Sequence, residues 1–455
     1  MVIVAWPLLA FGGVYPWAYT PLLIGAALWS VVNVWRSRRS PDRRLGPIAA
    51  AMAAVGVAIG LQLIPLPAGA LAATSPAAPD WLFEFDVPYA VLTAQGHQVW
   101  HPLSLNPSAT ARALGFYTVL AVFLYAVAVS LPRYDTRALL RWTVTLAAVI
   151  GVVAIIQQRT FNGKIYWFWV PEATTGNVFG PFVNRNHFAG WMVMALSAGL
   201  GLAGAEFRES MAGRRRDLRT RLMWLTSPRG SRVLLTGYGL LVMAVALVWP
   251  MSRSGIISFV IAVALTSIWV GRSVQSRLTR VLTYAVLVAL VAIPIYWRGV
   301  DRVSDWFADT RSLSGRVAAA GYAMAAASDF ALTGSGINTF RSLMFKYQRN
   351  NTEEHLAEAH NDYLQLAAEG GVLVGVPILV LIALFVRAAA SRIREVAGDV
   401  RHYWLKVGAS TGMLAIAVQS LVEFSLQKPA NAVLFCVLAG IVLQRPASRA
   451  SVSAT

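Results

Sequence analysis

The chain has 455 residues, of which 57% are hydrophobic and only 13% are charged. A soluble protein has about 25% charged residues, and one water-facing globule could not bury this much apolar surface, so the composition excludes a soluble enzyme. The formal net charge of +18 does not by itself indicate nucleic-acid binding, because it must first be placed along the chain. The sequence predicts an integral membrane protein, and its single cysteine, Cys436, excludes an intramolecular disulfide.

A membrane-spanning helix needs about 20 mostly apolar residues, and eleven segments approach that length between charged or Pro- and Gly-rich breaks. They are 17–35, 46–64, 114–131, 139–157, 187–205, 233–250, 256–270, 281–297, 372–386, 405–424 and 431–443. The apolar segment 1–11 is predicted to be a short twelfth helix. A signal-peptide core is the alternative, but the segment has no basic n-region and no obvious cleavage site. We expect an all-α polytopic membrane protein with about 12 transmembrane helices.

Lysine and arginine fall unevenly on the two sides of these predicted spans. One side holds 26 of the 39, with blocks at 36–44 and 208–232, and has a net charge of +19 against −1 on the other. Because basic residues stay on the cytoplasmic side, we expect this side and the C-terminus to be cytoplasmic, and the N-terminus too if the count is twelve. Most of the +18 is thus a topology signal. Contact of the basic blocks with anionic membrane lipids is the alternative, and neither interpretation needs nucleic acid.

Three predicted external segments are long enough to do more than connect spans. The loops 67–111 and 158–186 carry aromatic clusters, which are usually interfacial belts, with sugar stacking as the alternative. In the segment 298–370 we expect helices over 316–330, after Asn338 and over 353–369, with Gly370-Gly371 as the last stop. The chain accordingly divides into 1–297 with nine membrane helices, a helical periplasmic loop 298–370, and 371–455 with three membrane helices and a cytoplasmic tail.

Two arginines stand at predicted external ends of spans. Arg253 lies in the tight turn Ser252-Arg253-Ser254-Gly255, and Arg185 lies at a helix start in Asn184-Arg185-Asn186-His187. Charge near membrane depth usually faces a cavity or a partner, and guanidinium donors beside a helix N-terminus make an anion site. The structural alternatives are an Arg253 that snorkels to the head groups and an asparagine that merely caps a span.

A histidine lies near the end of the long external segment, in Ala359-His360-Asn361-Asp362-Tyr363-Leu364 followed by Glu369-Gly370-Gly371. On a helix, His360 would share a face with Tyr363, Leu364 and Ala367 and be held against the membrane domain. Histidine is the most frequent general base near neutral pH. A structural histidine on an apolar face is the alternative that spacing alone leaves open.

These blocks together resemble the O-antigen ligase/polymerase family. The similarity rests on the 360–364 block with Glu369-Gly370, on Arg316 with Gly334-Ser335-Gly336 and Phe340, and on the turn 252–255. The segments 184–187 and Val422-Glu423-Phe424-Ser425-Leu426 are similar too. The resemblance runs from about residue 179 to the end, and the first third is similar only in being hydrophobic.

The resemblance implies a GT-C-like fold and an enzyme of the bacterial inner membrane with its active site on the periplasmic side. It implies glycan transfer from undecaprenyl pyrophosphate to an acceptor hydroxyl, of lipid A–core or a similar glycan, without a cofactor or a catalytic metal. Carried onto this sequence, it implies His360 as the base and Arg185 and Arg253 as pyrophosphate ligands. Arg316 would bind phosphate or fix the loop helix, and Asn186, Asn361 and Tyr363 are the expected supporting residues.

The residue types fit that chemistry on their own terms. When an acceptor hydroxyl attacks the anomeric carbon, pyrophosphate leaves with growing negative charge, which guanidinium donors stabilise by about 1.5–3 kcal/mol per charged hydrogen bond. A glycosidase-type carboxylate pair is not evident. The stripe Asp301, Asp305 and Asp309 fits a solvated helix face better than a metal site, and Pro102 with its loop makes His97 and His101 a poor ligand pair.

Alternatives stay open at this point. An O-antigen or exopolysaccharide polymerase and a protein O-oligosaccharyltransferase would need the same base and the same phosphate ligands. A secondary transporter or lipid flippase would also have about twelve spans, but such proteins place ionisable residues near the midplane on broken helices. Here the predicted spans are nearly free of charge, with Glu423 as the main exception. The sequence does not indicate an oligomeric state.

Overall fold

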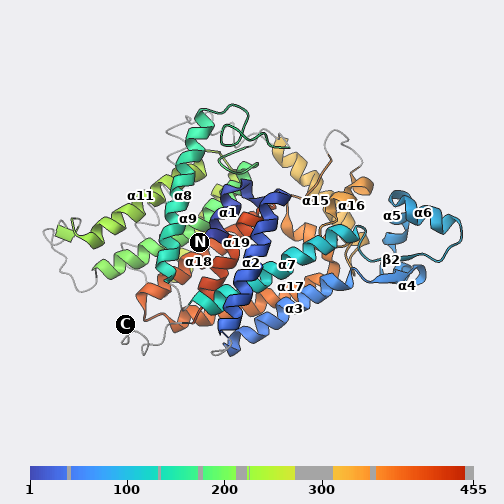
Figure 1. The fold of residues 1–455 in the computed structure, drawn as a ribbon, viewed down its shortest axis with the longest axis horizontal. Coiled ribbons are helices and arrows are strands. Elements are labelled where there is room, and N and C mark those ends of the chain that lie inside the picture. The colour runs from blue at the N-terminus through green and yellow to red at the C-terminus, as the bar shows by residue number, and fades with distance from the viewer. Residues whose placement is uncertain are drawn as a thin grey trace.

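The computed structural model describes residues 1–37, 42–131, 135–172, 178–211, 223–224, 226–271, 311–348 and 355–445. Within these ranges nearly all regular structure is helical, and long helices pack side by side (Figure 1). The long helices are α2 (Pro16–Ser37), α3 (Gly46–Leu61), α7 (Pro107–Ser130), α8 (Thr136–Arg159), α9 (Arg185–Met211), α11 (Pro228–Val248), α12 (Arg253–Gly271), α15 (Arg311–Asp329), α17 (Asp362–Glu395), α18 (Val400–Gln419) and α19 (Pro429–Leu443).

Eight helices in the described part of the chain are long and apolar enough to cross a membrane: α2, α3, α7, α8, α9, α11, α12 and α17. They coincide with eight of the predicted spans and confirm an all-α polytopic membrane protein. The helices α18 and α19 stand where the last two spans are predicted. The predicted span 281–297 and the stripe Asp301, Asp305 and Asp309 lie outside the described residues, so the total of about twelve stays a prediction.

The predicted short helix at the start of the chain is α1 (Val2–Leu9), followed by a 3-10 turn, η1 (Phe11–Gly13). Its 8 residues rise about 12 Å, less than half of the roughly 30 Å hydrocarbon core of a bilayer, so α1 does not cross alone. Gly12 and Gly13 have φ values of 76° and 74°, which only glycine adopts without strain, and they turn the chain into α2. A Cβ at Gly12 would lie 2.9 Å from the Phe182 ring, so the turn packs tightly.

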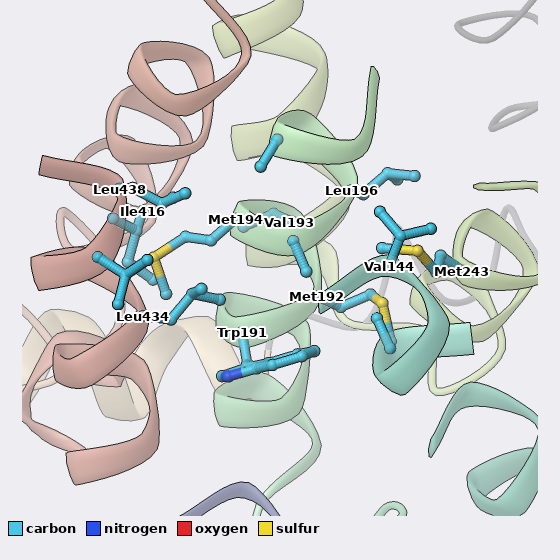
Figure 2. Close-up of a cluster of buried hydrophobic side chains, with 14 of the residues drawn as sticks. Val144, Trp191, Met192, Val193, Met194, Leu196, Met243, Ile416, Leu434 and Leu438 are labelled. Atoms are coloured by element: carbon cyan, nitrogen blue, oxygen red, sulfur yellow. The ribbon is translucent and has the colours of Figure 1, made fainter. Parts of the chain in front are cut away.

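The centre of the bundle is α9, which is buried on nearly all sides and packs against α8, α11, α12, α18 and α19. Figure 2 shows the reason: Trp191, Met192, Val193, Met194 and Leu196 point from α9 toward different neighbours. Such all-round apolarity is typical of a helix surrounded by others. Where α9 meets α18, a Cβ at Gly201 or Gly408 would collide with the opposite backbone, so these glycines set the close approach of the two helices.

A second, smaller hydrophobic core lies beyond the ends of α3 and α7 (Figure 1, right). It combines two segments far apart in the sequence. The first contains β1 (Pro65–Pro67), α4 (Ala68–Thr74), α5 (Ala77–Phe85), α6 (Val87–Ala94) and β2 (Trp100–Pro102), with β1 and β2 antiparallel. The second is α15 with α16 (Phe340–Tyr347). The predicted helix over 316–330 and the helix after Asn338 are thereby confirmed.

Gln62, at the end of α3, joins these two segments to α17. Its amide nitrogen donates to the carbonyl oxygens of Thr333 (2.8 Å) and Glu369 (2.9 Å), and its amide oxygen accepts from the N–H of Ile337 (3.1 Å). Gly334, with φ 68°, leaves no space for a Cβ beside the Glu369 carbonyl. Gly334-Ser335-Gly336 therefore fixes the segment after α15 against α17.

The prediction of a helix over 353–369 is wrong at its start, whereas the predicted stop at Gly370-Gly371 is confirmed. Residues 355–361 are not helical, and α17 begins at Asp362 because the Asn361 side chain accepts from the N–H groups of Tyr363 and Leu364. Gly371, with φ 54° and ψ −159°, ends the first helical stretch of α17, and a second stretch follows it to Glu395. Residues 353 and 354 lie outside the described ranges.

The bundle has two ends, the His360 end and the Arg392 end. The His360 end also contains Gln62, Asn186, Ser252 and Glu423. The Arg392 end also contains Asp42, Glu395, Lys406 and Gln444.

Candidate functional site

Segments from three parts of the chain meet at Glu423, which lies fully buried in the turn between α18 and α19. From the start of α9, the Asn186 side-chain nitrogen donates to Glu423 Oε1 at 2.6 Å. From α15, the Arg316 guanidinium donates to the same oxygen. From the segment before α17, His360 Nδ1 lies 3.6 Å from Glu423 Oε2. A buried carboxylate is costly unless it is paired, and here the ion pair with Arg316 is the main compensation.

His360 has a backbone φ of 51°, which is uncommon for a residue with a side chain. It precedes the Asn361 cap and so lies outside α17, which makes the predicted shared helix face with Tyr363, Leu364 and Ala367 wrong. Its imidazole is 30% exposed and meets the Phe424 ring edge-to-face, with centroids 4.9 Å apart. The 3.6 Å contact with Glu423 is longer than a hydrogen bond, but catalytic contacts are often long until substrate binds.

The three residues after His360 tie the first turn of α17 to residues 417–427. Asn361 Nδ2 donates to Leu421 O (2.9 Å), Ser420 Oγ and Gln427 Nε2 donate to the Asp362 carboxylate (both 2.7 Å), and the Tyr363 hydroxyl donates to Ala417 O (2.7 Å). Because residues 417–427 include Glu423, these bonds fix the distance between the imidazole and the carboxylate.

The starts of α9 and α12 are joined to each other and bring their arginines together. Ser252 Oγ donates to Asn186 Oδ1 at 2.8 Å, and the Arg185 guanidinium donates to Pro250 O at 3.2 Å. Arg185 lies within electrostatic range of Arg253, Arg316 and Glu423. Three guanidinium groups therefore gather near two helix N-termini, which is an arrangement that favours an anion.

Several buried polar atoms at this end have no hydrogen-bond partner within the described ranges. They are His360 Nδ1, Glu423 Oε2, His187 Nε2, Gln419 Oε1 and Asn431 Oδ1. Buried polar atoms are nearly always paired, so a group of exceptions points to bound water or to a functional site. No group of His, Cys, Asp and Glu that could hold a metal gathers among the residues described.

The structure brings together five of the predicted site residues, Arg185, Asn186, Arg253, Arg316 and His360. Asn361 and Tyr363 lie next to them, in the bonds that hold the start of α17. The residue whose importance sequence reasoning underestimated is Glu423. It was expected inside the span 405–424, yet α18 ends at Gln419 and Glu423 lies in the turn that follows. The sequence feature that could have identified Glu423 is its position as an acidic residue in an otherwise apolar stretch.

Residues 238–379 match the family model described as O-antigen ligase. Over this range the chain is similar to the O-antigen ligase family. The predicted resemblance is confirmed, although the match is shorter than the predicted range from about 179 to the end. No protein in the curated set of sequences matches the chain.

The O-antigen ligase match begins within α11 and ends within α17, so it includes Arg253, Arg316 and His360. Arg185 and Glu423 lie outside the matched range and join the site only through the fold. This match and the apolar helices support a multi-pass membrane glycosyltransferase of the O-antigen ligase/polymerase type, with a lipid-linked glycan and an acceptor as its partners in general terms.

Proposed function

We propose that the protein transfers a glycan from undecaprenyl pyrophosphate to an acceptor hydroxyl, of lipid A–core or a similar glycan, at the periplasmic face of the bacterial inner membrane. The observation that carries this proposal is the convergence on Glu423. One oxygen of this carboxylate is bound by Arg316 and Asn186, and the other faces His360. A base and a set of phosphate-binding side chains thus lie around one buried group.

His360 is the proposed general base. Glu423 faces Nδ1, so it would hold the proton there and leave Nε2 to accept the proton of the acceptor hydroxyl. The hydroxyl oxygen then forms a bond to the anomeric carbon as the bond from that carbon to the pyrophosphate oxygen breaks. Glu423 stabilises the imidazolium that results, and a positioned base of this kind contributes about 10²–10⁴-fold.

Arg185 and Arg253 are the proposed ligands of the pyrophosphate, which leaves with both electrons of the broken bond and gains negative charge. Arg316 has a dual part in the proposal, because it binds Glu423 and has further donors for a phosphate oxygen. Asn186 supports the site by joining the starts of α9 and α12 to Glu423. Asn361 and Tyr363 support it by holding the turn that carries Glu423. The proposal assigns no step to a metal or a cofactor.

The proposed orientation is supported by the charges at the two ends. The Arg392 end carries Arg44, Arg137, Arg392, Arg401 and Arg445, which supports a cytoplasmic position for this end and for the C-terminus. The His360 end is then periplasmic. The second hydrophobic core, shared by 65–105 with α15 and α16, supports a periplasmic element built from both the first external loop and the segment 298–370, between the membrane segments 1–297 and 371–455.

The decisive experiment uses purified protein, labelled lipid-linked glycan and acceptor, without any ion gradient. His360→Ala should lower kcat by at least about 10²-fold, whereas His402→Ala, at the opposite end, should stay within about twofold of wild type. Arg253→Lys should raise the KM for the donor about tenfold, because lysine lacks the forked guanidinium.

Full transfer by His360→Ala would overturn the mechanism. A requirement for a gradient, with no covalent product, would favour a transporter or flippase instead. The identity of the product distinguishes a ligase from a polymerase and from a protein O-oligosaccharyltransferase, which would share this base and these arginines.

A further inference from the structure

The side chains of Phe424, Lys428 and Glu358 form a connected chain of contacts that begins at His360. The His360 imidazole meets the Phe424 ring edge-to-face at 4.9 Å, and Lys428 Nζ lies 4.4 Å from the centre of the same ring. Lys428 Nζ also lies 3.2 Å from Glu358 Oε1. Since Glu358 is two residues before His360, the contacts return to the segment where they begin.

This closed chain of contacts holds His360, which has few other contacts that fix its position. His360 has a backbone conformation that a residue with a side chain rarely adopts. Its Nδ1 makes no hydrogen bond within the described part of the molecule. With neither a helix nor a hydrogen bond to fix the imidazole, the Phe424 ring and the anchored backbone at Glu358 are what hold it.

Phe424 is itself held from the centre of the bundle. The buried His187 of α9 meets the same ring edge-to-face, with centroids 4.7 Å apart. Lys428 immediately precedes α19 and is mostly buried, with its side chain 17% exposed. The imidazole of His360 is therefore connected through one aromatic ring to α9 and through one ion pair to the start of α19.

We propose that Phe424 and the Lys428–Glu358 ion pair are positioning residues for His360 in glycan transfer. The inference rests on the proposed function of His360 as the base. Phe424 limits the rotation of the imidazole so that Nδ1 stays opposite Glu423, and the ion pair keeps the segment 358–360 in its unusual backbone conformation. None of the three touches the pyrophosphate or the acceptor in this assignment, so their loss should affect kcat and leave donor binding unchanged.

The test compares Phe424→Leu and Lys428→Met with matched variants elsewhere. Phe424→Leu and Lys428→Met should each lower kcat by about 10- to 100-fold, since a small misplacement of a catalytic group costs up to about 10² in rate. The KM for the lipid-linked donor should stay within about twofold. Lys428→Arg retains both the charge and the contact with the ring and should restore most of the rate. The controls are Phe123→Leu in the central core and Arg401→Met in an ion pair at the Arg392 end, which should leave kcat within about twofold.

A second measurement separates positioning from a general loss of structure. Modification of histidines by diethyl pyrocarbonate, mapped by mass spectrometry, should become several-fold faster at His360 in Phe424→Leu and stay unchanged at His402. Wild-type kcat in both Phe424→Leu and Lys428→Met, together with an inactive His360→Ala, would overturn the positioning role alone. Full activity of His360→Ala would overturn the base assignment and this inference with it. A rise in donor KM that accounts for the whole loss would also contradict the inference.

Discussion

The two ends of the helix bundle differ in how completely their buried charged groups are paired. At the Arg392 end, the buried Arg392 is paired with both Asp42 and Glu395, and the buried Lys406 donates to three carbonyl oxygens. At the His360 end, Glu423 Oε2 and His360 Nδ1 face each other without a hydrogen bond to any described residue. A satisfied network stabilises a fold, whereas an incomplete one leaves donors and acceptors for a substrate.

Lys406 illustrates the structural use of a charge. It is fully buried in α18, and its Nζ lies 3.0, 2.6 and 2.9 Å from the carbonyl oxygens of Ile441, Val442 and Gln444. These oxygens belong to the end of α19, where helical carbonyls have no partner within the helix and attract positive charge. One ammonium group therefore ends α19 and joins it to α18.

The arginines show the same contrast. At the Arg392 end, one buried arginine is paired with two carboxylates, and Asp42 also forms an ion pair with Arg445. At the His360 end, Arg316 is paired with Glu423, and Arg185 lies within electrostatic range of Arg253, Arg316 and Glu423. We infer that the first arrangement is complete in the resting protein and that the second is completed by the pyrophosphate of the donor.

The largest effect is expected when the carboxylate of the His360 end is neutralised. Glu423→Gln keeps the size of the side chain and can still contact Asn186, but it cannot stabilise an imidazolium and it leaves Arg316 without its counter-charge. We expect kcat for glycan transfer to fall about 10²–10⁴-fold. The matched variant at the other end, Glu395→Gln, should change kcat by less than about twofold. Near wild-type transfer by Glu423→Gln would remove Glu423 from the mechanism.

The second effect separates stability from activity. Lys406→Met removes the donor of three buried carbonyl oxygens, and unsatisfied buried groups cost about 1–3 kcal/mol. We expect a loss of about 3 kcal/mol in unfolding free energy, seen as a lower thermal midpoint in detergent, while the folded fraction keeps its kcat. Arg401→Met breaks a more exposed pair with Glu209 and should cost less than about 1 kcal/mol. A Lys406→Met protein that is as stable as wild type would show that water replaces the ammonium group.

Apolar length alone predicted the helices well, because a span must satisfy its backbone within itself. It also located the arginines and the histidine one by one, since each interrupts an apolar stretch. It could not predict that residues 185, 316, 360 and 423 converge, because that depends on how α9, α15, α17 and α18 pack. The conformation of His360 was mispredicted because Asn361 caps α17, so the helix begins at Asp362 and not at 353 as the helical pattern suggests.

Charge counting had a similar limit. Lys406 was counted with the basic side as a topology signal, and it does lie at the Arg392 end, but its burial among carbonyl oxygens has no signature in composition. Glu423 was predicted to lie inside a span, because the sequence does not show that α18 ends four residues before it. Contacts between side chains of different helices can be identified only when the packing of the helices is known.

The smallest effect concerns Asp399, which caps α18 at the Arg392 end and accepts from His402 Nδ1 at 2.6 Å. Burial alone would raise the pKa of this carboxyl, but the hydrogen bonds from the His402 side chain and from the backbone of His402 and Arg401 lower it below its usual range. A carboxyl with a lowered pKa contributes stability above its ordinary pKa of about 3.9 and loses that contribution as the pH falls through the folded value.

Asp399→Asn retains the cap and removes only the charge. At pH 7 it should cost less than about 1 kcal/mol, because the pair is exposed. The difference in thermal midpoint from wild type should vanish once the pH is below the folded pKa of Asp399, and a difference that persists there would assign the effect to the cap rather than to the charge.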